Sequence, residues 1–159
     1  MSSQQDEKSV LPLEGIKVLD FTQAMMGPLT AMMLGDMGAD VIKVERIRGE
    51  AIRHGRPAAM DDLYQGEVDK EKFIDHGMWI GHNRSKRSLA IDIRDGRGRE
   101  VILRLAKDTD VFLQNFRPGV IDRLGLGYDV ISRINPRVIY CSVYGFGETG
   151  PLAHRVGGD

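Results

Sequence analysis

Residues 13–46 read LEGIKVLDFTQAMMGPLTAMMLGDMGADVIKVER, and this stretch has the pattern of a complete β-α-β unit. Residues 16–21 form a short, nearly continuous apolar run, which is typical of a strand covered on both faces. Residues 41–45 form a second strand of this kind. Two strands joined in this way are parallel with a right-handed crossover, so we expect the ligand-binding edge at the loops that follow the strands.

The helix between these strands is expected to begin at Pro28, because proline suits the first helical position, where a missing N–H costs nothing. Gly38 is expected to end the helix. The apolar residues that share one helical face, and that we therefore expect to face the core, are Leu29, Met32, Met33 and Met37.

The loop after the first strand argues against a dinucleotide-binding domain. Residues 22–28 read TQAMMGP and hold one glycine, whereas a pyrophosphate cradle needs three. Glu45, at the end of the second strand, occupies the place of the ribose-binding acid of such domains. Because the glycine pattern is missing, a plain NAD or FAD domain is disfavoured.

The rest of the chain continues the alternation of strands and helices. We expect a short helix within 73–82, a strand at 88–93, a helix at 98–107, a strand at 111–113, helices at 120–124 and 128–134, and a strand at 138–143. This order predicts an α/β fold with a Rossmann-like, mainly parallel, doubly wound sheet. Residues 1–12 are expected to be a flexible leader, and residues 47–72 a long polar connection.

The composition of the chain argues against nucleic-acid binding, membrane association and a metal site. The chain has 159 residues, of which 42% are hydrophobic, as expected of one soluble unit. The net charge of −1 gives no case for nucleic acid or an anionic membrane, and no apolar run is long enough to span a bilayer. Cys141 is the single cysteine, which fits a reducing, cytoplasmic location. The histidines lack zinc-site spacing, so no metal is expected.

Arginines gather around the predicted ligand edge, in the loop after the second strand and on both sides of the third. They are Arg46, Arg48, Arg53, Arg56, Arg84, Arg87 and Arg94. Guanidinium groups suit phosphate, which they bind with two hydrogen bonds at once. The alternative is a solvated surface on which these arginines pair with nearby carboxylates such as Glu45 and Glu50. Composition alone does not favour either the phosphate-binding interpretation or the solvated-surface interpretation.

Four blocks in order resemble the class III coenzyme A transferases, a family that includes formyl-CoA, carnitine and benzylsuccinate CoA-transferases and the α-methylacyl-CoA racemases. The blocks are LEGIKVLDFTQAMMGP at 13–28, LGDMGADVIKVER at 34–46, NRSKRSLAIDI at 83–93, and QNFRPGVIDRLGLGYDVISRINPRVIYCSVYGFGETGP at 114–151. The resemblance implies that residues 13–159 are the N-terminal, coenzyme A-binding portion of the large domain of that fold. It also implies an interlocked homodimer for the full-length protein.

The resemblance also implies which residues contact the coenzyme. The matching positions are Gln23, Ala24, Met25, Met26, Arg46, Ile91, Arg94, Asn115, Phe116 and Arg123. The implied ligands are an acyl-CoA and a carboxylic acid acceptor, with no metal. The arginine-rich edge thereby gains a named phosphate ligand, and this favours the phosphate interpretation.

The implied activity is the transfer of coenzyme A between an acyl-CoA and a free carboxylic acid, while the donor and acceptor stay unassigned. The family's nucleophilic aspartate matches no residue of this chain, since Asp159 matches an acidic position that precedes it. We therefore expect these 159 residues alone to be inactive. Two alternatives stay open: an α-methylacyl-CoA racemase, disfavoured because Gly158 replaces a proton-shuttling histidine, and a non-catalytic CoA-binding module completed by a second chain.

Overall fold

The computed structural model describes residues 10–54, 77–155 and 157, and its centre is a five-stranded sheet in the order β3-β2-β1-β4-β5. The strands are β1 Lys17–Asp20, β2 Asp40–Glu45, β3 Lys86–Ala90, β4 Val111–Gln114 and β5 Ile139–Ser142. Each neighbouring pair is parallel, so the carboxyl ends of the strands share one edge of the sheet. The predicted α/β class with a parallel sheet is confirmed.

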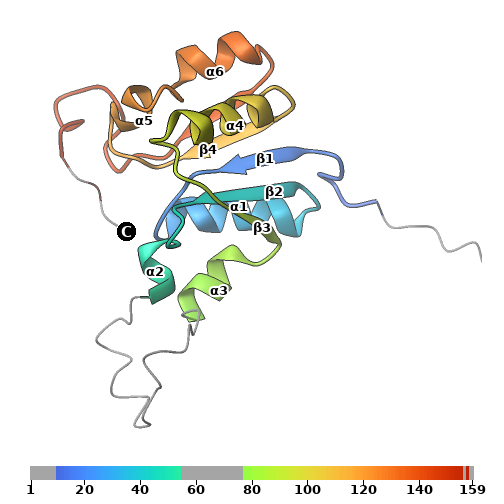
Figure 1. Cartoon of the computed structure of the whole chain (residues 1–159). Coiled ribbons are helices and arrows are strands. Elements are labelled where there is room, and N and C mark those ends of the chain that lie inside the picture. Colours follow the sequence, from blue (N-terminus) through green and yellow to red (C-terminus); the bar gives the residue numbers. More distant parts are fainter. Residues whose placement is uncertain (1–9, 55–76, 156, 158–159) are drawn as a thin grey trace, which may run out of the picture.

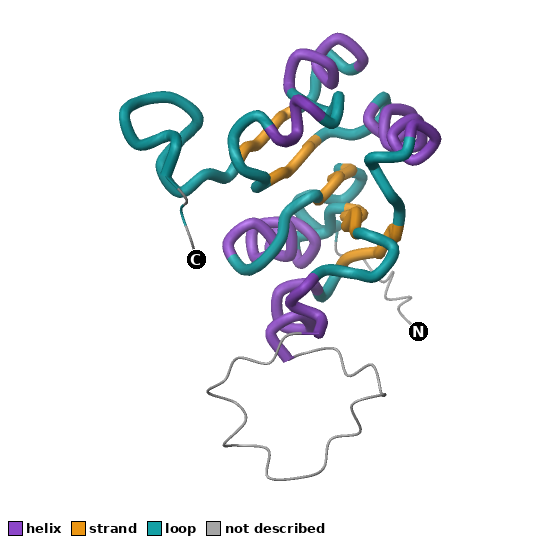
Figure 2. Tube along the Cα trace, turned by 60° about the vertical axis from the view of Figure 1, so that its left-hand side comes forward, coloured by secondary structure: helices purple, strands orange, loops and turns teal. Residues whose placement is uncertain are grey.

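Helices cover both faces of this sheet, as a doubly wound fold requires (Figure 1). Helices α1 Met26–Asp36 and α3 Gly77–Asn83 lie on one side, with the short α2 Ala51–His54 next to α3. Helices α4 Gly96–Ala106, α5 Val120–Arg123 and α6 Tyr128–Ile134 lie on the other side. Figure 2 shows the same layers from a second direction.

Two apolar clusters fill the space between the sheet and these helices. Alternate strand residues point to opposite faces, so Leu19 packs with Ile102 of α4, whereas Val18 packs with Ala31 of α1. Phe112 of β4 stacks on both Phe21 and Tyr140, with ring centroids 4.7 and 4.9 Å apart. The apolar runs thus form strands buried on both faces, as predicted for 16–21 and 41–45.

Helix α1 differs from its prediction in two respects. It begins at Met26, so Pro28 is its third residue and not its first. The predicted core stripe is right only for Met32, which is buried, whereas Leu29, Met33 and Met37 are exposed. The buried residues are Gly27, Pro28, Ala31 and Met32. Because the helix is apolar on nearly all sides, periodicity could not select the face that contacts the sheet.

Other predicted elements shift by a few residues. Strand β3 lies two to three residues earlier than 88–93, so Ile91 and Ile93 fall in the loop after it. Helix α4 starts at Gly96, because the side chain of Asp95 accepts a hydrogen bond from the backbone N–H of Arg97 and caps the helix. Helix α2 was not predicted; it lies inside the expected polar connection.

Several predictions concern residues outside the described ranges. These are most of the leader, most of the connection 47–72, the first part of the helix expected at 73–82, Arg56, Gly158 and Asp159. Among the helices of the described ranges, none has the length and apolar character needed to cross a membrane.

Candidate functional site

The loops that follow the strands enclose a cleft of about 720 Å³ at the carboxyl edge of the sheet. Its apolar lining comes from different loops and strands: Phe21, Val44, Ile91 and Phe116. Three arginines also line it: Arg46, Arg48 and Arg94. Apolar surface beside convergent cationic groups suits a ligand that combines a flat ring with anionic groups. In open parallel sheets, ligands bind at this edge.

Part of the predicted coenzyme-binding set meets in this cleft. The members that line it are Gln23, Arg46, Ile91, Arg94 and Phe116. Asn115 is not part of the lining, but it contacts a residue that is: its side-chain oxygen accepts a hydrogen bond from the Gln23 backbone N–H at 2.8 Å. Contact of these residues with a ligand stays a prediction.

The remaining predicted residues lie next to the cleft and are not part of its lining. Ala24, Met25 and Met26 continue the loop into α1 and are exposed. Arg123 is exposed on α5, whose neighbours Val120 and Leu124 line the cleft. Among the lining residues that the sequence did not single out are Phe21, Val44 and Val120, whereas Arg48 was already one of the arginines expected at this edge. For the first three, their positions at strand ends and on the short helix after β4 are the signal that could have found them.

Most of the clustered basic residues pair with carboxylates, as the alternative interpretation expected. The pairs are Arg53 with Glu45, Arg84 with Asp36, Arg87 with Asp40, and Arg94 with Asp92. Arg94 reaches Asp92 through two hydrogen bonds of 3.0 and 3.1 Å, so a phosphate would compete with that carboxylate. Within the described part of the chain, Arg46 has no ion-pair partner. Arg46 is therefore the arginine best placed for an incoming anion.

Glu45 also lines the cleft, but both of its carboxylate oxygens are bonded to side chains of the chain itself, so it does not present a free carboxylate as a ribose-binding acid does. Arg53 donates to both of its carboxylate oxygens at 2.8 Å, and Ser88 donates to Oε1 at 2.8 Å. The Arg53 guanidinium also lies 3.6 Å from the ring centroid of Trp79. Burial raises the pKa of Glu45, but the hydrogen bonds from Arg53 and Ser88 outweigh it and hold the pKa below 4.5.

This network predicts a loss of stability in acid. Because the pKa of Glu45 is lower in the folded chain, its contribution is present above pH 4.5 and is lost as pH falls through the folded value. We expect urea unfolding between about pH 6 and about pH 3 to show a shallower pH dependence in Glu45→Gln than in the wild type. Glu100→Gln, at an exposed position on α4, should keep the wild-type dependence. Identical slopes for Glu45→Gln and the wild type would contradict this assignment.

A buried charged cluster lies directly beneath the loop that follows β1. Asp20 is fully buried and accepts a hydrogen bond from Lys86 Nζ at 2.8 Å. Lys43 is also buried, and its Nζ lies 3.1 Å from Glu50 Oε2. Burial lowers the pKa of Lys86, against the opposing effect of the Asp20 carboxylate. The sequence signal for this cluster is limited to Asp20 and Lys43, each of which interrupts an apolar strand run, whereas Lys86 and Glu50 lie outside such runs.

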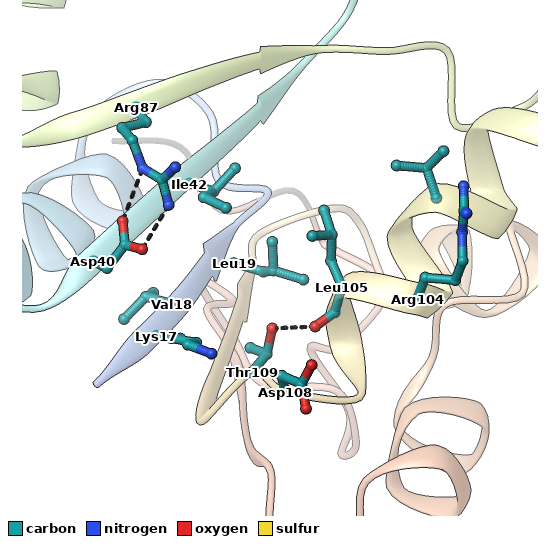
Figure 3. A pocket seen from close by; sticks show the side chains of 11 residues that line it. Lys17, Val18, Leu19, Asp40, Ile42, Arg87, Arg104, Leu105, Asp108 and Thr109 are labelled. Atoms are coloured by element: carbon teal, nitrogen blue, oxygen red, sulfur yellow. Dashed lines mark hydrogen bonds and ion pairs between the residues drawn. The ribbon is translucent and has the colours of Figure 1, made fainter. Parts of the chain in front are cut away.

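A second cavity of about 630 Å³ opens at the opposite edge, between β1, β2 and α4 (Figure 3). Arg87 and Asp40 form an ion pair on its wall, and Thr109 donates to the Leu105 carbonyl. One of its ion pairs is thus already formed within the protein, and the cavity lies at the amino ends of the strands. The cleft at the carboxyl edge is the better candidate site. The described residues include no group of three or more His, Cys, Asp or Glu side chains arranged to hold a metal.

Comparison with known proteins gives consistent findings. The family model described as CoA-transferase family III matches residues 13–159. Succinyl-CoA:glutarate CoA-transferase of Mus musculus is 42% identical over 159 residues, which cover 98% of this chain and 33% of the relative. The β subunit of succinyl-CoA–L-malate CoA-transferase from Chloroflexus aurantiacus is 39% identical, over 94% of this chain and 36% of its own length.

A solved structure agrees with these sequence relatives. The crystal structure of a CAIB/BAIF family protein from Brucella suis superposes with a TM-score of 0.80 and 40% identity. The match covers 92% of this chain and 37% of the other. The chain spans about a third of the length of the curated relatives it matches.

Proposed function

Since the chain belongs to CoA-transferase family III, we propose that it supplies the coenzyme A-binding cleft of an enzyme that moves coenzyme A between an acyl-CoA and a free carboxylic acid. The observation that carries the proposal is the cleft at the carboxyl edge, where apolar side chains meet arginines. The adenine ring of coenzyme A has apolar faces, and its phosphates carry the charge that guanidinium groups bind. Residues 13–159 then form the N-terminal, coenzyme-binding portion of a larger domain.

In the proposed reaction, this chain binds the coenzyme and another part of the enzyme supplies the nucleophile. A carboxylate outside residues 1–159 attacks the thioester carbonyl, which gives an acyl–enzyme anhydride and free coenzyme A. The coenzyme A thiolate then attacks the enzyme carbonyl of the anhydride, releases the first acid and leaves an enzyme–CoA thioester, which passes coenzyme A to the acceptor acid. The present residues hold the coenzyme through these steps. The names of the relatives support dicarboxylic acids as the acceptor class.

Two experiments test the proposal. Calorimetric titration of the 159-residue chain with coenzyme A should give saturable binding, and no binding heat at any temperature tried would overturn the assignment of the cleft. The whole enzyme, given an acyl-CoA and an acceptor acid, should form the second acyl-CoA. If it instead took up α-deuterium from deuterated buffer without an acceptor, it would be a racemase.

Arg46 carries the sharpest binding prediction. We expect Arg46→Ala to weaken coenzyme A binding about tenfold to a hundredfold, because a charge-assisted phosphate contact contributes roughly 1.5–3 kcal/mol. Arg104→Ala is the matched control, because Arg104 is an exposed arginine on α4 that lines the opposite cavity. Calorimetry compares the two variants. Equal affinities would remove Arg46 from the site.

A homodimer and a cytoplasmic location belong to the same proposal. The dimer rests on the resemblance to the family, and the exposed apolar residues of α1 support it, since a helix that is apolar on all sides is normally covered. The location rests on the single cysteine, which fits a reducing compartment. Sedimentation of the whole enzyme tests the dimer, and a monomer at all concentrations would rule it out. Fractionation of the source cells tests the location.

A further inference from the structure

The loop between β1 and α1 is held by side chains from three other segments of the chain. Lys43 Nζ donates to the Thr22 carbonyl at 2.6 Å, Asn115 bonds both the N–H and the carbonyl of Gln23 at 2.8 and 2.7 Å, and Glu50 Oε1 accepts from the Ala24 N–H at 2.5 Å. Three consecutive residues thus have backbone groups bonded to side chains distant in sequence. Such a loop has little freedom to adapt when a ligand arrives.

Ala24 is the residue of this loop that most needs support. Its φ is +65°, in the left-handed region that alanine rarely adopts. A residue persists there only when its surroundings impose the conformation. Glu50 supplies the side chain that bonds its N–H, so removing Glu50 frees the loop at the point where its backbone is least favoured.

Glu50 is itself an unusual group. The residue is 5% exposed, and one carboxylate oxygen bonds Ala24 while the other lies 3.1 Å from the Lys43 ammonium. That second oxygen makes no hydrogen bond to any described residue. A buried carboxylate is costly to desolvate, and here the charge of Lys43 offsets the cost.

The bond from Glu50 to Ala24 joins two loops that line the cleft. Glu50 directly follows residues 46–49, all of which line the cleft, and Ala24 directly follows Gln23, which also lines it. Glu50 is not part of the lining. We propose that Glu50 is a positioning residue, which fixes the β1–α1 loop against the β2–α2 loop and thereby preforms the cleft for coenzyme A. This inference rests on the proposed function for the identity of the ligand.

The test compares Glu50→Ala with Glu50→Gln in the 159-residue chain. Glutamine keeps an oxygen that can accept from the Ala24 N–H but loses the charge beside Lys43. We expect Glu50→Ala to speed exchange of the Ala24 amide, measured by NMR without ligand, and to weaken coenzyme A binding in calorimetry, each about tenfold or more. Glu50→Gln should lower the thermal midpoint and yet stay within about threefold of the wild type in both exchange and affinity.

Asn135→Ala is the matched control. Asn135 donates to the Ala106 and Thr109 carbonyls at 3.1 and 2.7 Å, at the amino edge of the sheet and away from the cleft. This variant should lose stability but keep the wild-type affinity. If it weakened binding as much as Glu50→Ala, the role of Glu50 would be general stability and the proposal would be overturned.

Other outcomes are equally decisive. Unchanged Ala24 exchange, or unchanged affinity, in a folded Glu50→Ala chain overturns the proposal. If Glu50→Ala does not fold, the measurements on Glu50→Gln test the proposal instead. Fast exchange of the Ala24 amide together with wild-type affinity for coenzyme A would show that binding does not need a fixed loop, and would overturn the proposal. A wild-type chain that does not bind coenzyme A overturns the proposed function instead, and the exchange rates still report whether Glu50 holds the loop.

Discussion

Replacing Asp20 with alanine is expected to lower the free energy of unfolding by about 3–5 kcal/mol, because it leaves the buried ammonium group of Lys86 without the carboxylate that pairs with it. Asp20 is fully buried and bonds Lys86 Nζ through one oxygen, while its other oxygen accepts from the backbone and the hydroxyl of Thr22. Lys43 Nζ lies 3.9 Å away as well. The loss corresponds to a fall on the order of 10 °C in the thermal midpoint.

Asp40→Ala provides a closely matched control. Asp40 pairs with Arg87, the residue after Lys86 on β3, but both side chains of that pair are about half exposed or more. Exposed pairs contribute less than about 1 kcal/mol, so this variant should unfold close to the wild type. Urea unfolding followed by circular dichroism and by the fluorescence of Trp79, the single tryptophan, measures both. Comparable losses in the two variants would contradict the role given to burial.

The sheet could be predicted from the sequence because its strands are short apolar runs, and each predicted strand overlaps an observed one. The end of β3 was misplaced for a physical reason. Ile91 and Ile93 continue the apolar pattern of the strand but lie in the loop beyond it, where they line the cleft. An apolar residue that faces a ligand cleft has the same pattern as one that faces a core.

Only those residues of the candidate site that directly follow a strand in the sequence could be predicted. Gln23, Arg46 and Phe116 each come just after a strand, so a parallel sheet brings them to one edge. The contacts that hold the site are different in kind. Asn115 meets Gln23 across 92 residues, and Glu50 meets Ala24 across 26. Such contacts depend on how close two loops approach in space, which no local pattern encodes.

A second large effect is expected from Gly98→Ala. Gly98 is buried in the first turn of α4, and a Cβ at this position would fall 2.1 Å from the backbone carbonyl oxygen of Asp92. A backbone carbonyl cannot move away by changing rotamer as a flexible side chain can, so either the helix or the 91–95 loop must shift. The strain should lower the free energy of unfolding by about 3 kcal/mol, more than the ~1 kcal/mol that alanine gains in helix propensity.

Gly96→Ala separates this contact from the general effect of replacing a helical glycine. Gly96 belongs to the same helix, but a Cβ there would meet nothing within 4 Å. This variant should therefore unfold at the same or slightly higher urea concentration than the wild type. Because the loop displaced by Gly98→Ala carries Ile91 and Arg94 into the cleft, coenzyme A affinity should fall in that variant and hold in Gly96→Ala. Equal stability of the two alanine variants would mean that the 91–95 loop can move without an energetic cost. That result would contradict the strain assigned to a Cβ at Gly98.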